Sequence, residues 1–163
     1  MDKREICAFL EESGVEYELT EHPAVYNMAE VARIQLPYDV SAKNLFVRDN
    51  KRQFYCMITV PGAKRVDLRA FRHEQGLRPL SMAPEEELQE MLCLKPGSVT
   101  PFGLLNDSRH RVTLFLDCDF QGGRIGVHPN ENTATVWLRA SDLVGILRNS
   151  GVDVRIVSVP AQP

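Results

Sequence analysis

Several features that commonly reveal a protein's chemistry are missing from this 163-residue sequence. It contains no run of the roughly 18–20 apolar residues that a membrane-spanning helix needs. It has none of the glycine patterns that bind dinucleotides or nucleotide phosphates, and no HExxH pair of histidines. The GxSxG elbow of many serine hydrolases is also absent. These absences argue against a membrane-spanning protein, a nucleotide-binding enzyme, a zinc protease and an α/β-hydrolase.

Cysteine is scarce too, with four residues at positions 7, 56, 93 and 118 and no CxxC pair. Paired cysteines hold structural zinc or act as redox dithiols, so neither is expected. Isolated cysteines favour buried thiols in a reducing compartment, and we expect Cys56 and Cys118 to be inert core residues. The charged start Met1–Glu5 does not resemble a signal peptide. The sequence therefore predicts one cytoplasmic domain spanning residues 1–163.

Charge is unevenly distributed along the chain, whose net charge is −3. Residues 1–40 carry nine acidic and three basic groups, whereas residues 41–78 carry nine basic and three acidic groups. A basic segment inside an acidic protein is typical of a local phosphate-binding face. Charge alone favours the other interpretation, a solvated surface whose charges cluster only in sequence, because a nonspecific nucleic-acid binder usually has a positive net charge. Both interpretations stay open.

Apolar spacing predicts a strand-rich fold with several helices. The helices are expected at 3–13, 27–36, 66–75, 84–92 and 141–149, and the strands at 15–19, 44–48, 54–60, 112–116, 125–127, 133–138 and 152–157. Because hairpins alternate with helical crossovers, the expected class is α+β with a mixed sheet.

Three polar segments lie where these elements begin or end, and they carry the candidate chemistry. Ser41–Phe46 brings a lysine and an amide into a strand. Gly97–Pro101 is a loop stiffened by prolines, in which glycine permits a close backbone approach to a ligand. Val127–Asn132 is a polar loop between two strands. Free backbone N–H groups in such loops can bind an oxyanion.

Together these segments resemble the YbaK/prolyl-tRNA synthetase editing-domain family, in its free-standing ProX-like branch of aminoacyl-tRNA deacylases. The resemblance runs from about residue 3 to residue 157. It is carried by four motifs in chain order: Glu21-His22-Pro23-Ala24-Val25, Lys43-Asn44-Leu45-Phe46-Val47-Arg48-Asp49, Lys95-Pro96-Gly97-Ser98-Val99-Thr100-Pro101-Phe102-Gly103-Leu104 with Asn106-Asp107, and His128-Pro129-Asn130-Glu131-Asn132-Thr133.

The resemblance implies a barrel-like mixed sheet surrounded by helices, and hydrolysis of alanine from tRNA specific for proline. A proline pocket cannot strongly reject the smaller alanine, because missing methylenes change binding by only about 1–3 kcal/mol. A second, hydrolytic site is therefore needed. The resemblance implies aminoacylated tRNA as partner, through its 3′ CCA end and acceptor stem, and transient contact with prolyl-tRNA synthetase. It implies no metal, cofactor, membrane or DNA.

The resemblance also implies roles for individual residues. Lys43 would neutralise a phosphate near the terminal adenosine, and Asn44 would hydrogen-bond the aminoacyl or ribose end. His128 would position substrate or water, which the substrate's own ribose hydroxyl largely activates. Gly97 joins these three as a catalytic residue, in a loop whose backbone amides would contact the terminal adenosine and the ester carbonyl. The substrate-binding residues are Ser98, Val99, Thr100, Pro101 and Asn130, with an apolar wall of Val25, Met28, Val31 and Ile34.

Alternatives remain at this stage. The apolar wall has the spacing of ordinary core residues, and helical periodicity does not separate the two. Deacylation of cysteine from the same tRNA and a non-catalytic tRNA-end adaptor both fit the motifs. A nonspecific RNA-binding protein is disfavoured by the negative net charge and by the lack of an RNA-stacking motif.

Overall fold

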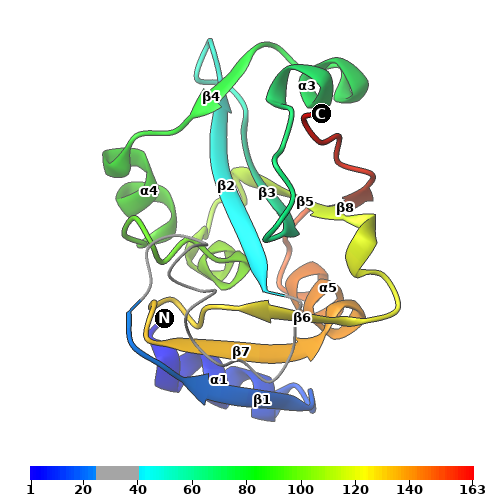
Figure 1. Cartoon of the computed structure of the whole chain (residues 1–163). Helices are drawn as coiled ribbons and strands as arrows, with labels where there is room; N and C mark the ends of the chain where they lie inside the picture. The colour runs from blue at the N-terminus through cyan, green and yellow to red at the C-terminus, as the bar shows by residue number, and fades with distance from the viewer. Residues whose placement is uncertain (25–40) are drawn as a thin grey trace.

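The computed structural model describes residues 1–24 and 41–163, and its strands form two sheets (Figure 1). The strands are β1 (Tyr17–Glu21), β2 (Ala42–Asp49), β3 (Tyr55–Pro61), β4 (Leu80–Met82), β5 (Val112–Asp117), β6 (Arg124–Val127), β7 (Ala134–Arg139) and β8 (Val154–Val157). The helices are α1 (Lys3–Glu12), α3 (Leu68–Gln75), α4 (Glu85–Leu92) and α5 (Ala140–Asn149), with short 3-10 helices η1 (Pro101–Asn106) and η2 (Cys118–Phe120).

The larger sheet has the order β4-β2-β3-β5-β8, and the smaller one has the order β1-β7-β6. β2 pairs antiparallel with β3 and β4, whereas β3, β5 and β8 run parallel to one another. The expected α+β class with a mixed sheet is therefore confirmed.

The described strands do not close into a barrel, so the barrel-like part of the expectation is corrected. The two sheets meet at one isolated parallel bridge, between Ser41 and Gly126. The outer strands β4 and β8 have three and four residues. Neither of them pairs with a described strand of the smaller sheet. The Ser41–Gly126 bridge places the start of β2 beside β6.

Gly126 is needed at this bridge because a side chain would collide with a neighbour. A Cβ at Gly126 would lie 2.4 Å from the Trp137 ring on β7. The fully buried indole donates its N–H to Thr20 Oγ1 on β1 at 3.0 Å. Glycine at position 126 therefore leaves room for the Trp137 ring beside the bridge to β2.

Side chains of the larger sheet alternate between two apolar clusters, as the pleat requires. Phe46 and Met57 belong to the cluster that also contains residues of α1, α4 and α5. Val47 and Cys56 belong to the second cluster, which contains Phe71 of α3. By the same alternation, Lys43 lies on the α3 face of the sheet, and Asn44 lies on the opposite face.

Most predicted elements are confirmed, with shifted ends. Asp67 caps α3 through the Ala70 N–H at 2.9 Å, so that helix begins at Leu68 rather than at 66. The sequence did not predict β4, η1 or η2. The predicted helix at 27–36 lies outside the described residues.

The cysteines are less uniformly buried than expected. Cys56 is buried, and burial raises the pKa of its thiol to about 12, as expected of an inert core residue. Cys118 lies half-buried in η2 rather than inside a strand, and Cys93 is exposed at the end of α4. The expectation of buried thiols is therefore wrong for Cys93. Among the described residues, no helix has the length and apolarity to cross a bilayer.

Candidate functional site

The loop before η1 begins with a tight turn that requires glycine. Ser98 N–H donates to the Lys95 carbonyl at 3.0 Å, and Gly97 has a φ of 85°. Pro96 followed by a glycine at positive φ is the pattern of a type II turn. Because the Ser98 N–H closes this turn, the Gly97 and Val99 N–H groups are the loop's candidate donors for a ligand.

Thr100 connects this loop to the His128 loop. Its hydroxyl donates to the His128 carbonyl at 2.5 Å, and its oxygen accepts from the Phe102 N–H at 3.4 Å. Thr100 thereby caps η1, and Pro101 follows at the first helical position, where its missing N–H costs nothing. Both side chains are buried. They hold the loop in place rather than line its surface.

Asn44 connects β2 to the same loop. Its amide Nδ2 donates to the Val99 carbonyl at 3.1 Å, and its Oδ1 accepts from the Thr59 hydroxyl at 2.6 Å. Thr59 is fully buried on β3, directly opposite Asn44 in the ladder. Asn44 is thus fixed from both ends, with a second amide hydrogen still available to a ligand.

His128 has a defined tautomer in this arrangement. Its Nδ1 lies 2.8 Å from the Ala134 carbonyl, which only accepts, so Nδ1 carries the hydrogen and Nε2 of the neutral ring has a lone pair. Burial lowers the pKa of His128, and the His22 ring, centred 6.1 Å away, lowers it further, against the Ala134 carbonyl, which raises it. His128 is therefore neutral near pH 7, with a proton-accepting nitrogen.

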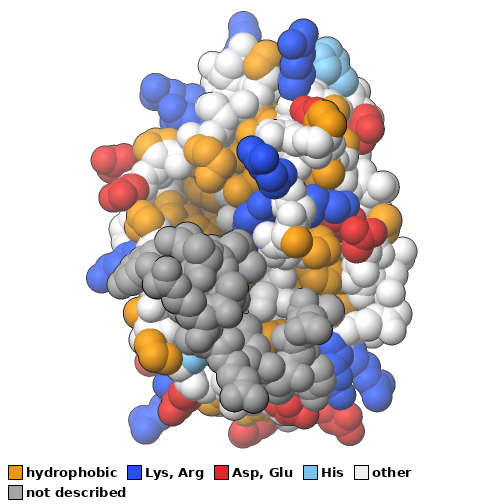
Figure 2. All heavy atoms as spheres, in the orientation of Figure 1, with side chains coloured by type: hydrophobic (Ala, Val, Ile, Leu, Met, Phe, Trp, Pro, Cys, Tyr) orange, Lys and Arg blue, Asp and Glu red, His pale blue; other side chains and the backbone are white. Residues whose placement is uncertain are grey.

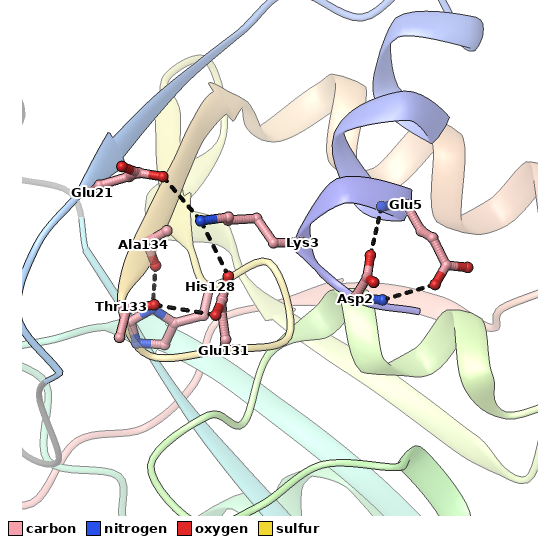
Figure 3. A network of polar contacts seen from close by, with 8 residues as sticks. All are labelled: Asp2, Lys3, Glu5, Glu21, His128, Glu131, Thr133 and Ala134. Carbon is pink, nitrogen blue, oxygen red and sulfur yellow. Dashed lines mark hydrogen bonds and ion pairs between the residues drawn. The ribbon is translucent and has the colours of Figure 1, made fainter.

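The loop that carries His128 is tied to the N-terminal elements (Figure 3). Lys3 of α1 contacts Glu21 of β1 at 2.9 Å and Glu131 at 3.4 Å, and Glu131 accepts from the Thr133 hydroxyl at 3.1 Å. These contacts join the loop to α1 and β1.

Asn130 of the same loop has a positive φ of 62°. Its Nδ2 donates to the Met1 carbonyl at 2.7 Å. Its buried Oδ1 has no hydrogen-bond partner among the described residues. Asn130 is an expected substrate-binding residue, and its Nδ2 is therefore used within the chain while its Oδ1 is not.

Lys43 lies apart from these residues. Its ammonium donates to the Lys64 carbonyl on the α3 face of the sheet, whereas Asn44 contacts Val99 on the other face. Burial lowers the pKa of Lys43, and the positive charge of Arg65 lowers it further. The Lys43-Asn44 pair therefore straddles the start of β2, with charge on one face and neutral hydrogen bonds on the other.

The structure thus brings together Asn44, Val99, Thr100 and His128 from three of the predicted motifs. It places Gly97 and Ser98 in the adjoining turn and Lys43 across the strand. The predicted pocket wall, Val25, Met28, Val31 and Ile34, lies outside the described residues. Sequence reasoning missed the roles of Thr59 and Arg65, and gave His22 no role although it quoted the motif that contains it.

One cluster of potential metal ligands occurs among the described residues, formed by Asp117, Cys118 and Asp119. The Lys64 ammonium lies 2.5 Å from an Asp117 oxygen and 3.2 Å from an Asp119 oxygen. The lysine therefore supplies the positive charge that these carboxylates attract.

Comparison with known proteins identifies relatives over most of the chain. The model of the aminoacyl-tRNA editing domain family matches residues 22–146. The chain is 36% identical over 151 residues to the prolyl-tRNA editing protein ProX of Acetoanaerobium sticklandii, covering 91% of this chain and 92% of the relative. It is 30% identical to prolyl-tRNA synthetase associated domain-containing protein 1 of Xenopus laevis, covering 95% of each.

A solved structure described as a candidate trans-editing enzyme for prolyl tRNA synthetase has the same fold. It superposes with a TM-score of 0.69 at 21% identity, covering 98% of this chain and 97% of the other.

Proposed function

This chain belongs to the aminoacyl-tRNA editing domain family, and on that premise we propose that it hydrolyses the aminoacyl ester of tRNA(Pro) mischarged with alanine. The observation that carries the proposal is a continuous hydrogen-bonded path. Thr59 holds Asn44, Asn44 holds the Val99 carbonyl, and Thr100 next to Val99 holds the His128 carbonyl. Residues distant in sequence thereby form one rigid site of neutral donors and acceptors, which suits ester hydrolysis.

In this reaction, water attacks the ester carbonyl carbon, the bond from that carbon to the ribose oxygen breaks, and a proton passes to the ribose oxygen. The neighbouring ribose hydroxyl of the terminal adenosine activates the water. The Nε2 lone pair of His128 accepts a hydrogen bond from that hydroxyl or from the water and so aligns the nucleophile. The free amide hydrogen of Asn44 binds the aminoacyl or ribose end.

The turn at Gly97 provides for the charge that develops on the carbonyl oxygen. The Gly97 and Val99 N–H groups donate to this oxyanion, and a fixed loop needs no reorganisation during the reaction. Lys43 binds a backbone phosphate next to the terminal adenosine from the other face of β2. A compact ammonium suits this role. None of these steps requires a metal ion or cofactor.

Selectivity for alanine over proline requires a small side-chain pocket. We propose Val25, Met28, Val31 and Ile34 as its wall, which excludes the proline ring by overpacking at a cost of about 1–3 kcal/mol. Met28→Ala should raise hydrolysis of prolyl-tRNA relative to alanyl-tRNA on the same tRNA(Pro). A constant ratio, with both rates and thermal stability falling together, would assign these residues to the core.

The decisive experiment offers the purified protein tRNA(Pro) charged with alanine, cysteine, serine or proline. Selective release of alanine supports the proposal, and selective release of cysteine favours the second candidate, a cysteinyl-tRNA deacylase. Binding of tRNA without release of any amino acid would instead identify an adaptor. As a trans-acting editor the protein is expected to work in the cytoplasm, beside prolyl-tRNA synthetase and in transient contact with it.

A further inference from the structure

The basic segment of residues 41–78 contains nine Lys and Arg residues, and the structure divides them by their surroundings. Three of them form ion pairs within the fold: Arg48 with Glu87, Lys64 with Asp117, and Arg78 with Asp49. These pairs join strands and helices of the larger sheet and are already neutralised. Because a carboxylate already pairs with each of these three cations, they have little attraction left for an external anion.

Lys43, Arg65 and Arg69 have different surroundings. No described carboxylate lies within ion-pair distance of any of the three, and Arg65 and Arg69 are exposed. Lys51, Arg52 and Arg72 form no such ion pair either, but Lys51 and Arg52 lie in the turn at the other end of β2, and Arg72 donates to the Leu77 carbonyl. Lys43 donates to the carbonyl of Lys64, the residue directly before Arg65. Among the described residues, two cations thus lie close together with no carboxylate at ion-pair distance, an arrangement that a bound anion stabilises.

The backbone that carries Arg65 is fixed by the C-terminal segment of the chain. Gln162 N–H donates to the Arg65 carbonyl at 2.8 Å, and Val66 forms a β-bridge with Ala161. Arg69 follows in the first turn of α3, whose cap Asp67 is occupied by the Ala70 N–H. These exposed guanidinium groups therefore extend from an ordered backbone.

The surface of the molecule agrees with this description. Figure 2 shows a group of Lys and Arg side chains in the middle of the face over the larger sheet, with others around the margin of that face, and Asp and Glu side chains at its sides and lower edge. Because the whole chain has a net charge of −3, a polyanion is attracted to one region rather than to the protein in general.

We propose that Arg65 and Arg69, continuing from Lys43, bind successive phosphates of the acceptor end of tRNA. We call these three residues the phosphate strip. The inference rests on the proposed function and adds to it the path that the tRNA backbone follows over the protein. The ester lies beside Asn44 and His128 on one face of β2, the terminal nucleotides cross the start of β2, and the preceding backbone follows the α3 face.

An RNA backbone fits this strip better than a single small anion does. The strip offers several cations in sequence, and guanidinium groups bind phosphate oxygens in a bidentate manner. A-form RNA is recognised largely through its phosphates and 2′-hydroxyls.

The test is the salt dependence of binding to uncharged tRNA(Pro), measured for wild type, for the double variant Arg65→Gln/Arg69→Gln and for Arg109→Gln. Arg109 is an exposed cation before β5, at the end of the sheet remote from Lys43, and serves as the matched control. Removing two phosphate contacts should lower the slope of log affinity against log salt by about 1.4–1.8. Affinity at low salt should fall at least about tenfold, and Arg109→Gln should match wild type.

A second substrate separates the strip from the chemistry. Wild type and the double variant should cleave an alanyl ester carried on a CA dinucleotide at equal rates, because its single phosphate reaches Lys43 but not Arg65 or Arg69. An unchanged salt slope, or an equal change in Arg109→Gln, would overturn the phosphate strip while leaving deacylation intact. A lowered slope in a protein that hydrolyses no aminoacyl-tRNA would retain the strip and refute the proposed function.

Discussion

The two ends of β2 each carry a half-buried cation, and the fold surrounds these cations in opposite ways. At one end, the Arg48 guanidinium meets the Glu87 carboxylate, which also accepts from the Tyr55 hydroxyl. At the other end, Lys43 donates to a neutral carbonyl, and the charge that acts on it is that of another cation, Arg65.

This difference indicates that the cation at one end of β2 stabilises the fold, whereas the cation at the other end is suited to bind an anion. A half-buried cation with its own carboxylate contributes to the free energy of folding, and its attraction for other anions is already satisfied. A cation that is desolvated without a carboxylate adds little to folding but retains its attraction for an external anion. The comparison predicts that substitutions at the two ends of β2 will affect different measurable quantities.

The largest effect is expected for Lys43→Ala. Loss of a charge-assisted phosphate contact, worth about 1.5–3 kcal/mol, should slow deacylation of alanyl-tRNA(Pro) about 10- to 100-fold. The free energy of unfolding should fall by less than about 1 kcal/mol, and the salt dependence of tRNA binding should become shallower. Steady-state kinetics measures the rate, urea denaturation measures the free energy of unfolding, and tRNA binding at several salt concentrations measures the salt dependence. An unchanged rate would remove Lys43 from the site.

Glu87→Gln should have the opposite profile. Arg48 and Glu87 are about one fifth exposed, so the variant leaves a largely buried guanidinium without its anion. We expect a loss of about 1–2 kcal/mol in unfolding free energy and an unchanged deacylation rate below the melting transition. Glu90→Gln, on the same helix but largely exposed, is the control and should change stability by less than about 0.5 kcal/mol. A large rate loss in Glu87→Gln would contradict the division between the two ends.

The pH dependence of the rate tests the neutral part of the site, through the ring of His128, separately from the cation Lys43. Because burial lowers the pKa of His128, its Nε2 lone pair should persist down to a pH below the ordinary histidine value of about 6.5. The rate should be constant near pH 7 and fall as acid protonates the ring, by up to about tenfold per pH unit. His128→Gln should lose this acid limb.

The same shift has a consequence for stability, with a defined sign. The unfolded chain takes up a proton at His128 at a higher pH than the folded chain does. Stability from the neutral ring is therefore present above about pH 6.5 and decreases as the pH falls towards the lowered pKa. The urea midpoint of wild type should therefore fall relative to that of His128→Gln in this acidic range, and the difference between the two midpoints should be constant above it.

The smallest effect is expected from chelation. The positive charge at the start of β2 comes from side chains, and Lys64 occupies the acidic cluster at Asp117 and Asp119. Treatment with a strong chelator should therefore leave the deacylation rate unchanged. Activity that disappears on chelation and returns with zinc would refute the metal-free mechanism.

Local sequence patterns predicted those parts of the fold that local physics determines. The apolar run at 54–60 and the β-branched and aromatic run at 112–116 identified β3 and β5, and the acidic first turn after Pro84 identified α4. The Thr100-Pro101 pair is a helix-start signal that could also have predicted η1. β4 has three residues, too few for a periodic pattern, and it depends on pairing with the edge of β2.

The site itself was predictable as a set of motifs but not as a geometry. Strand alternation alone would have placed Lys43 and Asn44 on opposite faces. No local pattern indicates that Arg65 lies beside Lys43, because that contact depends on how the chain folds back after β3. The partner of Asn44 on the 97–101 loop likewise depends on tertiary packing.

The single bridge between Ser41 and Gly126 also has a consequence for the order of folding. β2 and β3 are joined by a short loop, whereas Ser41 and Gly126 are far apart in the chain, so closing that contact costs more entropy. The β2-β3 hairpin can therefore form before the smaller sheet docks on it. Such an intermediate would already present Lys43 and Arg65 but would not yet have His128 in position. During refolding, affinity for RNA should accordingly return before hydrolytic activity does.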